Sequence, residues 1–235
     1  PNIQSWLESY NAVYTALAGG EQVIKEPRLL TRAVFPETVA PMLGDINWNQ
    51  DAPYNNACPL VQGSRSMTGC VATAMAMILK YHNFPVKGKG THSYKTSSGL
   101  ECSFDYGSTT FSWNEMRSQY VGGNYTTEEA NAVAELMHAC GVAVDMEYSP
   151  SSSGAYPFKV GQALIDYFGY DENLGYVCRQ YFTSEEWMNM IKTELSERRP
   201  VLYNGASKDV GHEFVFDGYD SQDMVHVNWG WGGLN

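Results

Sequence analysis

Residues 68–81 read Thr68-Gly69-Cys70-Val71-Ala72-Thr73-Ala74-Met75-Ala76-Met77-Ile78-Leu79-Lys80-Tyr81. This run of Ala, Met, Ile and Leu, with no proline before Pro85, predicts a helix from about Cys70 to His82. Ser66 or Thr68 is placed to cap it. Cys70 would lie in the first turn, where unpaired backbone N–H groups and the helix dipole stabilise negative charge. Because such a position lowers a thiol pKa from about 8.5 towards neutrality, Cys70 is a candidate nucleophile.

A histidine far downstream begins a predicted strand, Gly211-His212-Glu213-Phe214-Val215-Phe216-Asp217-Gly218-Tyr219. Alternation places His212, Phe214 and Phe216 on one face and directs Glu213 away from the Cys70 side. A turn at residues 220–223 then returns Asn228 and Trp229 towards His212. The Asn228 carbonyl can accept Nδ1–H of the imidazole, which leaves Nε2 for the thiol, and Trp229 can shield that hydrogen bond from water. A packed or surface histidine is the alternative interpretation of His212 alone.

Gln50, in Trp48-Asn49-Gln50, is a candidate oxyanion donor. Its amide beside the backbone N–H of Cys70 would stabilise a tetrahedral intermediate, and one such donor lowers a barrier by roughly 3–4 kcal/mol. Taken alone, Gln50 is better interpreted as a polar loop residue.

Composition limits the possible functions of the chain. It has 235 residues and a net charge of −11, which argues against a nucleic-acid-binding surface. No run approaches the roughly 18 apolar residues of a membrane span. Because the chain starts at Pro1, we expect a processed or trimmed product.

Five cysteines are spaced too widely for a zinc pattern, and no metal or other cofactor is expected. Their odd number leaves at least one thiol unpaired within the monomer. Cys140 is expected to be a buried thiol. Disulfide pairing remains an alternative for Cys58, Cys102 and Cys178.

The order of elements predicts an α+β fold. After the Cys70 helix, further helices are expected over residues 127–140, 160–168 and 184–197, the last starting at Thr183 or Ser184. Strands are expected at Val201–Tyr203, His212–Asp217 and Met224–Trp229. Residues 3–17 have the spacing of an amphipathic helix, and a proline-punctuated connector follows it. We therefore expect an appendage over residues 1–38 and a domain over residues 39–235.

Several motifs together resemble the streptopain family of bacterial papain-like cysteine peptidases, particularly its interpain-like members. They are Trp48-Asn49-Gln50, Pro53-Tyr54-Asn55, Thr68-Gly69-Cys70-Val71-Ala72-Thr73-Ala74, Gly211-His212, Asp217-Gly218 and His226-Val227-Asn228-Trp229-Gly230-Trp231-Gly232-Gly233. The resemblance implies a helical left subdomain, an antiparallel β-rich right subdomain and an active-site cleft between them. It also implies Cys70 as nucleophile, His212 as base and proton donor, Gln50 in the oxyanion hole, Asn228 orienting the imidazole and Trp229 covering it.

The family also runs a Ser/Gly loop along the cleft at the position of residues 149–154. The resemblance suggests that backbone groups of this loop (Ser152, Ser153 and Gly154) and of Gly211 hold the substrate main chain, with a plain surface turn as the alternative. Family members carry a small residue where this chain has Glu213, and they continue beyond the position of Asn235. Chemical tuning, not loss of function, is expected from Glu213.

The resemblance further implies a secreted or cell-surface bacterial endopeptidase made as a zymogen. Its partners would be protein and peptide substrates and an inhibitory N-terminal propeptide, of which residues 1–38 would be a remnant or connector. No nucleic-acid partner and no membrane span are expected. One alternative is a catalytically silent adhesin or binding module on the same fold. Acyl transfer to an amine is another, although such enzymes more often pair the histidine with an acidic residue.

Overall fold

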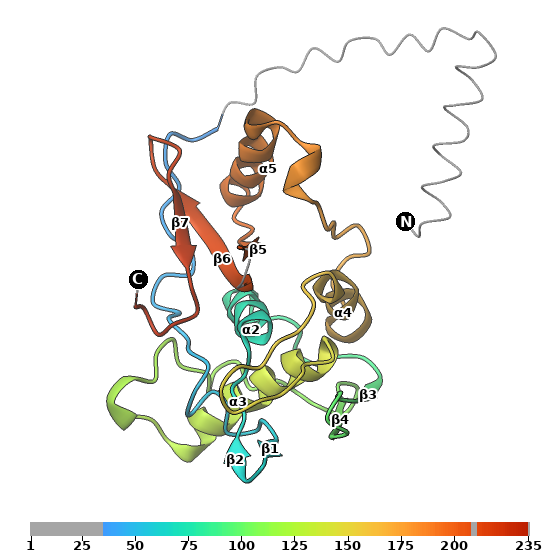
Figure 1. Cartoon of the computed structure of the whole chain (residues 1–235). Coiled ribbons are helices and arrows are strands. Elements are labelled where there is room, and N and C mark those ends of the chain that lie inside the picture. Colours follow the sequence, from blue (N-terminus) through green and yellow to red (C-terminus); the bar gives the residue numbers. More distant parts are fainter. Residues whose placement is uncertain (1–34, 208–210, 235) are drawn as a thin grey trace, which may run out of the picture. The chain divides into compact units, whose positions relative to one another are not determined.

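A computed structural model describes residues 35–207 and 211–234 of the chain (Figure 1). The helix expected over residues 3–17 and most of the proline-punctuated connector lie outside the described residues. The boundary near residue 38 therefore stays a prediction.

Helix α2 (Cys70–His82) has the bounds expected from the sequence. Every residue from Val71 to Leu79 is buried. The helix packs against α3 (Thr127–Ala143) and also against strand β6 (Gly211–Tyr219), so it lies between the helical part and the sheet (Figure 1). Cys70, its first residue, is thereby held where these two parts meet.

The helical part contains α2, α3 and α4 (Lys159–Phe168). Thr126 and Glu129 form a capping box that starts α3. The hairpin of β3 (Thr91–Lys95) and β4 (Glu101–Asp105) packs against α3, while β1 (Leu60–Val61) and β2 (Ser64–Arg65) form a second small hairpin. Single 3₁₀ turns occur at Val121–Gly123 and Arg179–Tyr181. The sequence patterns did not predict either hairpin.

The sheet part is antiparallel, with strand order β5-β6-β7, and the remaining strands are β5 (Val201–Ala206) and β7 (Val225–Asn228). Helix α5 (Ser184–Ser196) packs against β5 and β6 and starts at Thr183 with a capping box. All three strands occur where the sequence predicts them. Val39 pairs with Tyr219, so the described chain joins this sheet near its start.

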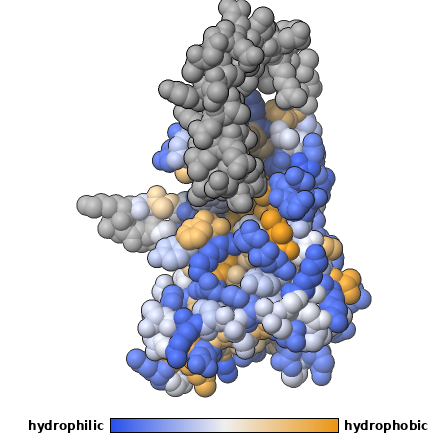
Figure 2. Space-filling view, turned by 90° about the vertical axis from the view of Figure 1, so that its right-hand side faces the viewer, coloured by the Kyte–Doolittle hydropathy of each residue, from blue (hydrophilic) through white to orange (hydrophobic). Residues whose placement is uncertain are grey.

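One hydrophobic core runs through both parts, as expected for an α+β fold. Its largest fully buried apolar side chains are Trp48, Tyr106, Phe168, Met75, Met77, Leu79, Leu136, Met137, Met146 and Leu195. Hydrophilic side chains cover most of the described surface visible in Figure 2, and apolar side chains form only small patches there. Among the described residues, no helix is long and apolar enough to cross a membrane.

Candidate active site

Gly69, not a side chain, caps α2. Gly69 has φ 85° and α2 has no side-chain cap, so the expected capping by Ser66 or Thr68 is wrong. The Thr68 hydroxyl instead shares a hydrogen bond of 2.8 Å with that of Thr73. A Cβ at Gly69 would lie 2.7 Å from the Met146 sulfur and 3.0 Å from the Ser153 carbonyl oxygen. Only glycine meets both demands, and the first-turn N–H groups are left free of side-chain caps.

Cys70 is a half-buried free thiol at the start of α2. Burial raises the pKa of the thiol, and the Glu213 carboxyl raises it further, whereas the N–H groups of Glu213, Val71 and Cys70 itself favour the thiolate. The expected lowering of this pKa is therefore wrong for this conformation, because burial outweighs the amide groups. No hydrogen bond within the described chain joins Cys70 to His212.

His212 is oriented by a main-chain carbonyl. Its Nε2 lies 2.8 Å from the carbonyl oxygen of Trp229, and because a carbonyl only accepts, Nε2 must carry the proton. Nδ1 is then the nitrogen available to a thiol, which reverses the assignment expected from the sequence. The ring lies 4.7 Å from the Trp231 ring and 6.1 Å from the Trp229 ring, measured between centroids.

Within the described residues Asn228 makes no hydrogen bond to His212, contrary to expectation. Its Nδ2 donates to the Ile46 carbonyl at 2.8 Å, and its Oδ1 accepts from the Gly230 N–H at 3.1 Å. Both bonds fix the turn that follows β7. Asn228 therefore acts on His212 through the position of the Trp229 carbonyl.

The backbone of Gln50 lies beside the segment that precedes Cys70. Its carbonyl accepts from the N–H of Thr68, two residues before Cys70, at 3.1 Å. The Trp48 carbonyl in turn accepts from the N–H of Gly232 at 2.9 Å, which joins the two tryptophan-containing motifs. The Gln50 side-chain amide makes no hydrogen bond to any described residue, so it is available to an oxyanion.

The loop of residues 149–154 borders the segment that precedes Cys70. The Ser153 hydroxyl is buried and donates to the Met67 carbonyl at 2.7 Å, so it fastens this loop to that segment. Gly154 exchanges both backbone hydrogen bonds with Glu147, so its N–H is already engaged within the loop. Ser152 is exposed and bonds to no described residue, so its backbone remains available. Gly211 is exposed at the start of β6 and pairs with Ala206.

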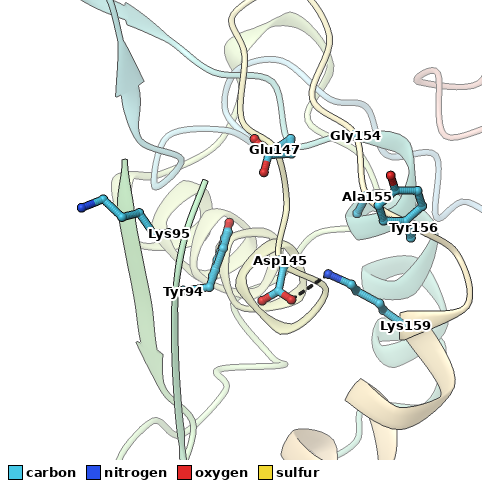
Figure 3. Close-up of a pocket in the computed structure, with 8 residues that line it drawn as sticks. All are labelled: Tyr94, Lys95, Asp145, Glu147, Gly154, Ala155, Tyr156 and Lys159. Carbon is cyan, nitrogen blue, oxygen red and sulfur yellow. Dashed lines mark hydrogen bonds and ion pairs between the residues drawn. The ribbon is translucent and has the colours of Figure 1, made fainter. Parts of the chain in front are cut away.

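A hollow of about 460 Å³ opens beside this loop, shown in Figure 3. Asp145 anchors its wall through Lys159 and His92, each at 2.7 Å. The pKa of the Asp145 carboxyl is lowered, because the hydrogen bonds and charges of these partners outweigh the effect of burial. The hollow is lined by Tyr94, Lys95, Asp145, Glu147, Gly154, Ala155, Tyr156 and Lys159.

All five cysteines are free thiols. Burial raises the pKa of Cys58 to about 12, and it also raises that of Cys140, which makes both unreactive. In the described part of the chain, no three His, Cys, Asp or Glu residues are grouped so that they could hold a metal ion.

Two features near the site were not predicted. Glu213 is buried, and its carboxyl charge raises the pKa of the Cys70 thiol, an influence that the alternation pattern did not indicate. Asp217 is also buried, accepting from the Leu43 N–H at 3.0 Å and pairing with Nδ1 of His226 at 2.6 Å. It sits at a β-bulge between Phe216 and Gly218, which alternation alone does not reveal.

Comparisons with known proteins agree with this geometry. Residues 48–235 match the Peptidase C10 family. Streptopain of Streptococcus pyogenes serotype M28 is 36% identical over 259 residues, covering 100% of this chain and 62% of that protein. The thiol protease/hemagglutinin PrtT of Porphyromonas gingivalis is 33% identical, covering 100% of this chain and 28% of that protein. The chain thus spans less than two thirds of these relatives.

Two solved structures of cysteine proteases are also similar to this chain. Active wild-type interpain A cysteine protease of Prevotella intermedia matches with a TM-score of 0.80 and 41% identity, over 85% of this chain and 84% of that one. A prointerpain A fragment matches with a TM-score of 0.80 and 39% identity, over 99% of this chain and 74% of that one. The expected papain-like fold is confirmed.

Proposed function

The chain belongs to the Peptidase C10 family, and on that premise we propose that it is a cysteine endopeptidase that hydrolyses peptide bonds of proteins. The observation that carries this proposal is the pairing of two local arrangements. Cys70 begins α2 among free backbone N–H groups, and His212 is oriented through Nε2 so that Nδ1 can serve a thiol.

The proposed reaction begins when Nδ1 of His212 takes the proton of the Cys70 thiol. The thiolate attacks the carbonyl carbon of the scissile bond, and the resulting oxyanion accepts hydrogen bonds from the Gln50 amide and the Cys70 N–H. The imidazolium, held by the Trp229 carbonyl, then gives its proton to the leaving amine. Water hydrolyses the remaining thioester with the same nitrogen as base, which regenerates the thiol.

An imidazolium beside the thiol is part of this proposal, because burial raises the pKa of the Cys70 thiol. An adjacent imidazolium would stabilise the thiolate and reverse that shift. We expect a Cys70 sulfur to His212 Nδ1 separation within about 4 Å in the active state.

Substrate binding is proposed for a narrower set than the sequence suggested. Ser152 and Gly211 are exposed near the site and can present backbone groups, whereas Ser153 and Gly154 are engaged within the loop and support it. We expect Ser152→Tyr to weaken peptide cleavage by obstructing the approach of the substrate main chain. Unchanged cleavage would mark the loop as ordinary surface.

The biological setting is also proposed. The relatives are bacterial proteases, and one matched structure is a prointerpain, the form implied by zymogen synthesis. We propose a secreted or cell-surface enzyme kept inactive by an N-terminal propeptide, to which residues 1–38 connect.

Two separate assays test the function: thiol labelling with an iodoacetamide or epoxide reagent, and hydrolysis of casein by unlabelled protein. We expect one labelled thiol, Cys70, and loss of both labelling and hydrolysis in His212→Ala. Cys58→Ala serves as the matched control. Because the Cys58 thiol is buried and should not react in the wild type, this variant should label and hydrolyse casein as the wild type does. Labelling without hydrolysis but with amine incorporation would indicate acyl transfer. Neither activity would indicate a catalytically silent binding module.

A further inference from the structure

Glu213 is a buried carboxyl with no cation beside it among residues 35–207 and 211–234. It is 2% exposed, and its Oε2 has no hydrogen-bond partner among the described residues. None of the ion pairs of the described chain includes it. A carboxyl buried this deeply is ordinarily paired or fully hydrogen-bonded, so its isolation requires an explanation.

The position of Glu213 relates it to the nucleophile. It lies on β6, which packs against α2, and its carboxyl charge raises the pKa of the Cys70 thiol. In an acyl-enzyme, Cys70 carries the acyl half of the substrate. The side chains of that half are thus brought to the neighbourhood of the Glu213 carboxyl.

In the described part of the chain, one polar side chain meets the carboxyl. Asn204 lies directly opposite Glu213 in the pairing of β5 with β6 and hydrogen-bonds to the carboxyl. Asn204 is itself exposed, and its Nδ2 also makes a long bond of 3.3 Å to the His212 carbonyl. A stronger donor arriving from solvent can therefore replace the Asn204 amide as the partner of Glu213.

We propose that Glu213 is a specificity-determining residue that selects substrates carrying a basic side chain, Lys or Arg, on the acyl side of the scissile bond. This inference rests on the proposed peptidase function. A guanidinium or ammonium group would supply the donors and the charge that Glu213 lacks, and the buried setting strengthens such a pair. A neutral side chain of the same shape would leave the carboxylate unpaired.

The selection should strengthen as pH rises. Burial raises the pKa of Glu213 to about 7, opposed by the hydrogen bond from Asn204, so the carboxyl carries its charge mainly above that pH. Around β6, α2 contributes Cys70 and β5 the uncharged Asn204, while His212 lies on β6 itself. From α5, Lys192 and Glu194 are paired with Asp223 and Arg199. His226 of β7 is occupied by Asp217.

Matched peptides containing arginine or citrulline test the inference, since the two side chains differ in charge but hardly in shape. The measured quantity is the ratio of kcat/KM for the two peptides within one protein, which cancels losses from folding. For the wild type at about pH 8 we expect a ratio of at least about tenfold, equivalent to about 1.4 kcal/mol. The ratio should shrink at about pH 5.5 and approach unity in Glu213→Gln.

Glu135→Gln is the matched control, because Glu135 is a carboxyl of α3 whose pKa is likewise raised by burial. It should keep the wild-type ratio. A wild-type ratio near unity at the higher pH overturns the inference even if Glu213→Gln does not fold. A ratio that survives in a folded Glu213→Gln protein overturns it as well.

Calorimetric binding of the same peptides separates this inference from the proposed function. Cys70→Ala should bind the arginine peptide more tightly than the citrulline peptide, and Cys70→Ala/Glu213→Gln should not. Discrimination in binding without cleavage by the wild type would reject the peptidase function and retain Glu213 as a binding residue. Cleavage by the wild type without discrimination between the peptides would retain the peptidase function and reject the role of Glu213.

Discussion

Asn228 illustrates how a single residue can position a proposed catalytic group through the backbone. Its amide fixes the turn after β7, and that turn presents the Trp229 carbonyl to His212. We expect Asn228→Ala to lower kcat by up to about 100-fold while changing KM little, because the loss is one of orientation. Steady-state kinetics together with thermal unfolding will show the effect. An unchanged kcat in a folded protein would remove Asn228 from the site.

Glu213 should also leave a signature in stability against pH. Its pKa is raised in the folded state to about 7 from 4.5, so the folded protein holds the proton more tightly than the unfolded chain. The stabilisation is therefore complete below about pH 4.5 and is lost as pH rises through about 7, amounting to about 3 kcal/mol. Denaturant unfolding of the wild type and of Glu213→Gln across this range measures the difference. A difference that does not vary with pH would contradict the buried, proton-holding carboxyl.

At this scale the sequence predicted residue types better than contacts. The sequence could indicate Cys70, His212 and Gln50 as candidates, because the chemistry proposed for them depends on their side-chain types. The acceptor for His212 is a backbone carbonyl. Every residue has one, so the residue types along the chain do not indicate which carbonyl is used. Burial of Glu213 depends equally on what α2 and β5 place around it.

Among the elements, α2 depends on the glycine before it. In Gly69→Ala the left-handed backbone would cost about 1–2 kcal/mol, and the new Cβ would clash with the Met146 sulfur at 2.7 Å. Gly63→Ala is the control, since Gly63 has φ 80° and no atom within 4 Å of its Cβ position. We expect denaturant unfolding to show a larger loss for Gly69→Ala, accompanied by slower labelling of Cys70. Equal losses would mean that Met146 moves aside freely.

Patterns found the longer elements and missed the short ones. Helices α2 to α5 bury a continuous stripe or a whole surface, and strands β5 to β7 lie between clear turn residues, so both give a periodic signal. Strand β3 is exposed at alternate positions and otherwise only half-buried, and β1 and β2 have two residues each. Burial does alternate along β3 and β4, but β3 has no fully buried side chain and β4 only that of Cys102, so the apolar signal is weak.

At the scale of the whole molecule, segments distant in sequence assemble the site around the start of α2. The carbonyl of Trp48 meets the N–H of Gly232, and the Asn228 amide meets the carbonyl of Ile46. The order of the motifs along the chain allowed a family resemblance to be recognised, but not these contacts. Contacts between distant segments follow from the packing of the two parts of the fold, which no local pattern encodes.

The same long-range pairing sets where the chain can be cut without loss. Val39 exchanges two backbone hydrogen bonds of 2.9 Å with Tyr219, and the Met42 N–H donates to the Asp217 carbonyl at 2.8 Å. Cleavage before Val39 should therefore leave the sheet and the site intact. The proline-punctuated connector offers such sites at Arg28 and Arg32 for a trypsin-like enzyme, and at Val34-Phe35 for the protein itself.

Limited proteolysis with N-terminal sequencing tests this boundary. We expect new N-termini between Lys25 and Val39, and a product that still labels at Cys70 and cleaves casein at least as fast as the intact chain. Pro41→Gly is an informative companion, because a looser segment beyond Val39 should extend cutting past the paired residues and reduce stability. Cuts within Thr73–Leu79 while the connector stays whole would contradict both the boundary and the zymogen proposal, because that helix is buried and its backbone should be inaccessible to a protease.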